Sequence, residues 1–205
     1  MVHGDAKGLI LPPRIAQIQV VIVPIFKTDN KEAVLAAATV LAKQLKKSFR
    51  IHLDTREYET PGAKFYEWEL KGVPLRIELG ARDIDAGVAM IADRLTGLKE
   101  AIKLAEIEEM VTKKLSDIQD ALFERAKKYR DERLYQTEES LAEFGPRLQA
   151  EGGFYRVGWN EDTNALDALK AFGGTIRCVL PEKLSTRCFF SGQPSSCDII
   201  VAKAY

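Results

Sequence analysis

Histidine, cysteine and long apolar runs are all scarce in this chain of 205 residues. Its two histidines, His3 and His52, lie far apart in sequence and away from any nucleophile motif, so a Ser-His or Cys-His catalytic centre has no support. No run approaches the roughly 20 apolar residues of a membrane helix, and the first residues do not form a signal-peptide pattern. We therefore expect a cytoplasmic protein that has no membrane partner.

The cysteines Cys178, Cys188 and Cys197 are too few and too poorly spaced for common cysteine chemistry. An odd number without a secretion signal favours reduced thiols over a disulfide framework. A tetrahedral zinc site needs four ligands, and these three thiols are about nine residues apart with no histidine nearby. Bound zinc is therefore not expected.

The chain also lacks an excess of charge of either sign, with 30 basic and 30 acidic residues. This balance does not exclude nucleic acid, because phosphate attraction depends on where basic side chains gather rather than on their sum. Apolar residues make up 46% of the chain, which is enough to bury a core in one or two domains.

The first half of the chain alternates strand and helix signals. Residues 1–16 are rich in glycine and proline and are expected to be an extended lead-in without a core of its own; Gly4, Lys7 and Gly8 do not have the spacing of a phosphate loop. Strands are predicted at 17–25, 51–53 and 75–79, with a helix over 31–48 and a helical turn through Phe65, Trp68 and Leu70. Two further strands at 87–94 and 99–103, joined at Gly97, predict a mixed sheet in a small α/β domain.

The apolar residues from Leu104 to Tyr129 step by threes and fours, which predicts one helix of roughly 30 residues. Its seam is compatible with a coiled coil, but a helix packed on the preceding sheet and the following domain is the simpler interpretation, because the pattern ends near Leu134. After Gly145-Pro146 and Gly152-Gly153, strands at 154–157, 175–180 and 199–204 and a helix over 161–172 predict a second, smaller α/β unit.

Three segments carry a family resemblance over the whole chain. They are the lead-in from Val2 to Ala16 running into the strand that ends at Ile25, the stretch KFYEWELKGVPLRIELGARD from Lys64 to Asp83, and the ending CFFSGQP from Cys188 to Pro194 with VAKAY from Val201 to Tyr205. Together they resemble prolyl-tRNA synthetases of the archaeal and eukaryotic type. The match is weakest in residues 105–150.

This resemblance implies an α/β fold with a mixed-sheet class II synthetase anticodon-binding domain at 17–104, a connecting helix at 105–134 and a C-terminal domain at 135–205. Residues 1–16 would be the last link to a catalytic domain that precedes them in the family. We therefore expect no catalytic residue and no cofactor in this chain, whereas the complete enzyme would use ATP and Mg²⁺ to activate proline, charge proline tRNA and form a homodimer. The family's C-terminal tyrosine, here Tyr205, can turn back toward the catalytic domain.

The resemblance also implies a tRNA anticodon-binding site made of Lys64, Phe65, Arg76, Glu78, Arg82 and Asp83. Arg76 and Glu78 share one face of a strand, and a turn at Gly80 would bring Arg82 and Asp83 to the end of the sheet. A carboxylate can accept hydrogen bonds from guanine N1 and N2, and arginine can bind guanine O6 and N7, which suits the two guanines of the proline anticodon. From composition alone the same four charged residues could form surface ion pairs.

Lys64 and Phe65 would supply a backbone contact and a stacking platform, although a phenylalanine near Trp68 is as often part of the core. Some family members hold a metal with paired cysteines. Here Ser191 stands where a partner of Cys188 would fall, and the stretch directly after Trp159 reads Asn160-Glu161-Asp162 without a cysteine, so the zinc pattern is broken.

Two other functions remain open from the sequence. The first is a free-standing paralogue that acts as an accessory or regulatory RNA-binding protein. The second is an independent enzyme, which the lack of a nucleophile, metal or cofactor constellation disfavours.

Overall fold

The computed structural model describes residues 3–204 and divides into two compact units, one up to Arg125 and one from Ala126. Tyr205, expected to turn toward a catalytic domain, lies outside the described residues. No helix within residues 3–204 is both long and apolar enough to cross a membrane. Each unit is a mixed α/β structure, as the sequence predicts.

The first unit is built on a five-stranded mixed sheet of order β4-β3-β5-β6-β7. Its strands are β3 (Val20–Ile25), β4 (Ile51–Leu53), β5 (Leu75–Gly80), β6 (Val88–Asp93) and β7 (Lys99–Lys103). β3 pairs in parallel with β4 and β5, whereas β6 and β7 are antiparallel additions. The helices between the parallel strands make the crossovers that such pairing requires.

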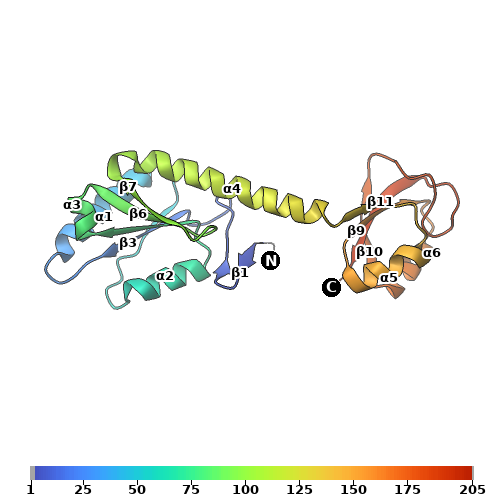
Figure 1. Cartoon of the computed structure of the whole chain (residues 1–205), viewed down its shortest axis with the longest axis horizontal. Helices are drawn as coiled ribbons and strands as arrows, with labels where there is room; N and C mark the ends of the chain where they lie inside the picture. The colour runs from blue at the N-terminus through green and yellow to red at the C-terminus, as the bar shows by residue number, and fades with distance from the viewer. Residues whose placement is uncertain (1–2, 205) are drawn as a thin grey trace. The chain divides into compact units, whose positions relative to one another are not determined.

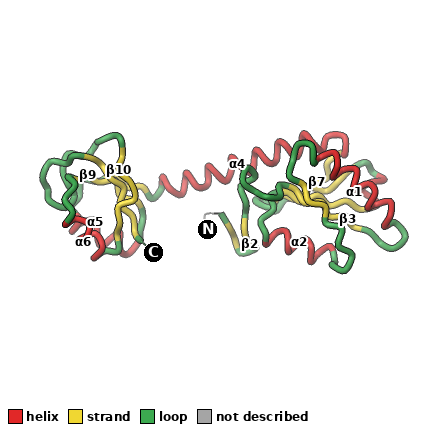
Figure 2. The backbone as a smooth tube through the Cα atoms, turned by 180° about the vertical axis from the view of Figure 1, so that it is seen from behind, coloured by secondary structure: helices red, strands yellow, loops and turns green. Residues whose placement is uncertain are grey.

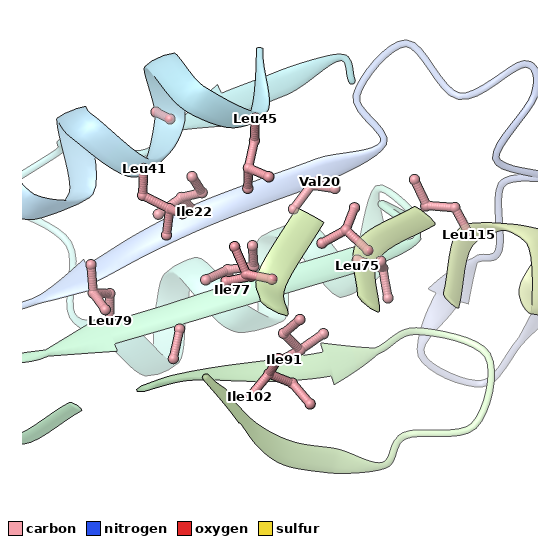
Figure 3. Close-up of a cluster of buried hydrophobic side chains, with 14 of the residues drawn as sticks. Val20, Ile22, Leu41, Leu45, Leu75, Ile77, Leu79, Ile91, Ile102 and Leu115 are labelled. Atoms are coloured by element: carbon pink, nitrogen blue, oxygen red, sulfur yellow. The ribbon is translucent and has the colours of Figure 1, made fainter. Parts of the chain in front are cut away.

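Helices cover the two faces of this sheet unequally. One face packs against α1 (Lys31–Leu45) and α4 (Ile107–Asp131), and Figure 3 shows Leu41 and Leu45 of α1 directed at the side chains of β3 and β5. The other face carries the shorter α2 (Pro61–Leu70), whose Trp68 packs on Val21 and Val23 of β3. Figure 1 shows α2 and α4 on opposite sides of the sheet. Because α2 contacts β3, the α2 side of β6 and β7 is left largely open.

The long helix begins slightly later than expected. A 3₁₀ turn, Leu104–Glu106, precedes α4, and the apolar seam of α4 is buried in the core of the first unit. The seam residues are Ile107, Val111, Leu115, Ile118 and Leu122. This burial agrees with the interpretation of a helix packed on the preceding sheet, because the seam needs no second chain to leave water.

The second unit has a four-stranded sheet of order β10-β11-β9-β8. Its elements are β8 (Leu134–Gln136), α5 (Leu141–Glu151), β9 (Phe154–Trp159), α6 (Asn164–Ala171), β10 (Gly174–Leu180) and β11 (Cys197–Lys203). α5 and α6 pack on the sheet through a core that includes Phe144, Leu148, Leu169, Tyr155 and Ile199. Figure 2 shows the two red helices beside the yellow strands of this unit.

Helix α5 runs through Gly145-Pro146, where no helix was predicted. Both residues lie inside the helix. Ser140 and Glu143 form a capping pair at its start, with the Ser140 N–H and hydroxyl both 2.8 Å from Glu143 Oε2. Burial of Phe144 and Leu148 on the sheet then outweighs the one backbone hydrogen bond that Pro146 cannot donate.

Two parts of the first unit contain structure that was not expected. In the lead-in, β1 (Gly4–Asp5) and β2 (Gly8–Leu9) form a short antiparallel hairpin. After β5, a short helix, α3 (Ala81–Asp85), forms where only a turn was predicted. Two-residue strands have no hydrophobic periodicity, so no sequence pattern could reveal them.

Candidate nucleic-acid interface

Strand register places several predicted residues on one face of the first unit's sheet. Across it, Val21 pairs with Arg76, Arg76 with Ala92, and Ala92 with Lys99. Two residues further along β5, Glu78 pairs with Met90. Laterally paired residues point to the same side of a sheet, and Val21 packs under Trp68 of α2. Arg76, Glu78 and Lys99 therefore lie on the α2 face, where β6 and β7 are not covered by a helix.

An aromatic ring with two cations over it marks the border between α2 and this open face. The Arg76 guanidinium carbon is 4.1 Å from the ring centroid of Phe65, and Lys99 Nζ is 5.0 Å from it. Such cation–π contacts attract the two side chains to the ring. Phe65 is only half-buried, so the same ring has surface left for stacking.

Two carboxylates share the cations of this cluster. Arg76 Nη1 lies 3.2 Å from Glu69 Oε1, and Arg76 Nε donates to Glu78 Oε1 at 3.0 Å. Lys99 Nζ lies 2.7 Å from the same Glu78 oxygen. The Glu69 side chain is 30% exposed and that of Glu78 only 10%, so Glu69 is the carboxylate that an incoming base can reach.

A hollow of about 40 Å³ lies beside the cluster, lined among others by Glu69, Arg76, Ala92 and Lys99. This volume holds water but not a nucleobase. A base that uses these side chains must therefore lie over the open sheet face rather than enter a preformed slot.

Lys64 lies apart from the cluster and is buried, with 2% of its surface exposed. Its Nζ donates to the Asp54 carbonyl oxygen at 3.2 Å and lies 3.7 Å from Asp54 Oδ1. Asp54 also accepts hydrogen bonds from Arg56 and from Trp68 Nε1. Lys64 thus has a structural partner, and its contact with an RNA backbone stays a prediction.

The ionisation of Asp54 reflects competition between burial and hydrogen bonding. Burial alone would raise its pKa, but the donors from Arg56 and Trp68 and the nearby Lys64 cation hold the pKa well below its usual range. Asp54 therefore stays charged and ties β4 to α2.

Arg82 and Asp83 lie at the opposite end of β5 from Arg76. Asp83 accepts the Gly80 N–H at 2.8 Å at the start of α3, and Arg82 is exposed. The four residue-to-residue steps along the strand from Arg76 to Gly80 span roughly 13 Å. The predicted set is thus split into a cluster at Phe65, Arg76 and Glu78, a pair at the end of β5, and the separate Lys64.

Two members of the cluster escaped the sequence reasoning, Glu69 and Lys99. Glu69 stands four residues after Phe65 on one helix, and this spacing places both side chains on one face. Lys99 begins a strand whose register with Arg76 no local pattern reveals. Only the first of the two could have been found from the sequence.

The residues present do not suit a resident metal. Within residues 3–204, no three His, Cys, Asp or Glu side chains are grouped so as to hold an ion. Cys188 is buried while Cys178 is exposed, and all three thiols are free. Burial would raise the pKa of Cys188, but hydrogen bonds from Ser191 and from backbone N–H groups lower it.

Comparison with known proteins shows which sequences this chain is similar to. Residues 19–114, which contain the whole cluster, match the anticodon binding domain family. The proline–tRNA ligase of Alkaliphilus oremlandii is 43% identical over 208 residues, and that of Acetoanaerobium sticklandii is 41% identical over 209. The alignment with the proline–tRNA ligase of Chloroherpeton thalassium has 41% identity over 219 residues.

Each alignment covers all of this chain but only 43 to 44% of the relative, so the chain spans less than half the length of the curated relatives it matches. The chain belongs to the prolyl-tRNA synthetase family and corresponds to the C-terminal portion of these enzymes, with their anticodon-binding domain.

Proposed function

We propose that this chain binds the anticodon loop of proline tRNA on the α2 face of its first unit. The observation that carries the proposal is the cluster of Phe65, Glu69, Arg76, Glu78 and Lys99, which lies inside the matched anticodon binding domain. Single-stranded RNA is read by stacking unpaired bases on aromatic or guanidinium planes and by hydrogen bonds to base edges. The cluster supplies both kinds of group.

In this proposal the side chains have distinct roles. Phe65 and the Arg76 plane provide stacking surface, and Glu69 accepts hydrogen bonds from the N1 and N2 groups of a guanine. Glu78, held by two cations, positions Arg76 and Lys99. Arg82 and Asp83, at the far end of β5, contact a neighbouring nucleotide. Lys64 acts indirectly, by tying α2 to Asp54.

The proposal extends to the complete protein. It would be a class II proline–tRNA ligase that uses ATP and Mg²⁺ to activate proline, with the anticodon-binding domain at 17–104, the connecting helix at 105–134 and the C-terminal domain at 135–205. Its partners would be proline tRNA, the catalytic domain of the same synthetase and a second subunit, in the cytoplasm. The support is that curated proline–tRNA ligases align with the whole chain.

The direct test is binding of the purified chain to a proline anticodon stem-loop, compared with a stem-loop whose two guanines are replaced by adenines. Fluorescence anisotropy at about 150 mM salt keeps nonspecific attraction moderate. We expect tighter binding of the guanine-containing loop, by roughly tenfold or more, because each lost base-edge contact removes about 1 to 3 kcal/mol. Equal binding of both loops, or none, would sink the proposal.

A further inference from the structure

The β1–β2 hairpin of the lead-in is docked on the C-terminal end of α2, as Figures 1 and 2 both show. Two glycines permit this contact. Gly8 has a φ of +126°, and a Cβ there would lie 2.6 Å from the Leu70 carbonyl oxygen. Gly72 has a φ of +74°, and its Cβ would lie 2.7 Å from Leu9 Cβ. Backbone approaches this close show that the hairpin is part of the folded unit.

A buried arginine clamps the hairpin to the candidate interface. Arg94 Nη1 and Nη2 donate to the two oxygens of Asp5 at 2.8 and 2.7 Å, and Arg94 Nε donates to the Glu69 carbonyl oxygen at 2.9 Å. Only 3% of the Arg94 side chain is exposed. The same Asp5 carboxylate accepts the Lys7 N–H at 2.8 Å. One guanidinium thus fixes the hairpin turn relative to Glu69.

The clamp brings Lys7 to the border of the interface. Lys7 lines the 40 Å³ hollow together with Glu69, Arg76 and Lys99. Four basic side chains (Lys7, Arg76, Arg94, Lys99) line this hollow, and three of them pair with the carboxylates of Asp5, Glu69 and Glu78.

Lys7 differs from the other three cations. Arg76, Arg94 and Lys99 each form a salt bridge, whereas Lys7 has no salt bridge to any acidic side chain among residues 3–204. It is also exposed. An exposed, unpaired lysine at the edge of an RNA site is the type of group that contacts phosphate oxygens, which fix the position of the RNA without reading its sequence.

We propose that Lys7 binds a backbone phosphate of the RNA whose bases lie on the α2 face, and that the Asp5–Arg94 clamp positions it there. The lead-in hairpin is then part of the RNA-binding surface rather than a linker. This inference rests on the proposed anticodon function. It adds a sequence-independent contact from a segment outside the matched domain, which begins at residue 19.

The test introduces Lys7→Gln into the full chain and measures its binding affinity for both stem-loops at several salt concentrations. We expect affinity for each loop to fall about twofold to tenfold, with the ratio between the loops unchanged. The slope of log affinity against log salt should become shallower by about 0.7 to 0.9, the share of one phosphate contact. Lys43→Gln is the matched control, because Lys43 is also an exposed lysine but lies on α1, on the opposite face of the sheet.

A second variant tests the clamp. Asp5→Asn should weaken binding of both loops. The double variant Asp5→Asn with Lys7→Gln should bind about as well as Lys7→Gln alone, because both changes remove the same contact, the one between Lys7 and the phosphate. Additive losses would show that Asp5 acts elsewhere and would overturn the positioning role.

The outcomes separate this inference from the function on which it rests. If the unchanged chain prefers the guanine-containing loop but Lys7→Gln alters neither affinity nor salt slope, the inference falls and the anticodon function stands. A changed ratio between the loops would make Lys7 a base reader and overturn its assignment to a phosphate. If the unchanged chain binds neither loop, both fall together.

Discussion

Glu69 and Glu78 carry the same side chain but differ in exposure and in their charged partners. Both interact with Arg76, but Glu78 also pairs with Lys99 and is nearly buried. Among residues 3–204, Glu69 forms a salt bridge with Arg76 alone, and its side chain is 30% exposed. A carboxylate held by two cations needs both to stay compensated, because an unpaired buried charge is costly. Glu69 is therefore the carboxylate that can turn toward a base without leaving two cations unpaired.

Glu69→Gln should lower selectivity for guanine while leaving the fold intact. The glutamine keeps the shape but has one acceptor oxygen and adds an N–H₂ donor, which opposes the guanine N1 and N2 donors. We expect the difference in binding free energy between the guanine and adenine loops to shrink by about 1 to 3 kcal/mol in anisotropy titrations.

The matched control is Glu67→Gln on the same helix. Glu67 has a comparable side-chain exposure of 33% but pairs with Arg56 and Lys71, away from Phe65. It should leave selectivity unchanged. A similar loss in both variants would mean that helix stability, rather than base reading, is being measured.

Asp54→Asn should destabilise the first unit in a pH-dependent way. The folded pKa of Asp54 is depressed, so its ionised form contributes stability that is present above the unfolded pKa of about 3.9 and is lost as pH falls toward the folded pKa. We expect urea unfolding to show a loss of about 2 to 4 kcal/mol at pH 7. The gap to the unchanged chain should narrow by about 1 kcal/mol at pH 3.

Glu57→Gln is the control for this pH effect, because its pair with Lys31 is exposed and should contribute under 1 kcal/mol. A gap between Asp54→Asn and the unchanged chain that stays constant from pH 7 to pH 3 would contradict the linkage.

Secondary-structure elements with strong periodicity were predictable, and those held by a single contact were not. The β-branched run of β3 and the stepped seam of α4 indicate their elements directly. The β1–β2 hairpin depends on Arg94, which lies 89 residues from Asp5, and α5 depends on packing that overrides Pro146. Such long-range causes leave no local pattern in the sequence.

The candidate site also combines residues that the sequence could indicate with residues that only long-range contacts bring in. Resemblance pointed to Phe65, Arg76 and Glu78, and the structure brings these three together. It adds Lys99 through strand register and Lys7 through the hairpin, neither of which the chain order reveals. Pairing across a sheet, rather than residue type, decides which charges meet.

Gly158→Ala should destabilise the second unit through a single element, β9. A Cβ at this position would lie 2.3 Å from the Arg187 carbonyl oxygen and 2.8 Å from Ser185 Cβ, so the loop between β10 and β11 must move away. We expect a loss of about 1 to 3 kcal/mol in chemical unfolding. Gly62→Ala, in α2 with nothing within 4 Å of its Cβ, should instead gain about 0.5 to 1 kcal/mol. An unchanged stability for Gly158→Ala would show that the loop yields freely.

At the scale of the whole chain, the two units have separate hydrophobic cores. Every buried residue of the first unit's two clusters precedes residue 123, and every one of the second unit's cluster follows residue 140. No buried apolar side chain is therefore common to both clusters among the described residues. Units that share little core surface unfold with limited cooperativity.

Truncation of each core should therefore act on its own unit. Ile77→Ala in β5 and Val157→Ala in β9 both remove fully buried side chains, and each should cost about 2 to 4 kcal/mol. Hydrogen-exchange mass spectrometry should show faster exchange in residues 17–122 for the first variant and in residues 140–204 for the second, each with little change in the other region. Because the cluster proposed to bind the anticodon lies in the first unit, only Ile77→Ala should weaken stem-loop binding as the temperature rises. Matching exchange increases in both regions for either variant would show that the units unfold as one, and that the proposed anticodon-binding surface depends on the integrity of the second core.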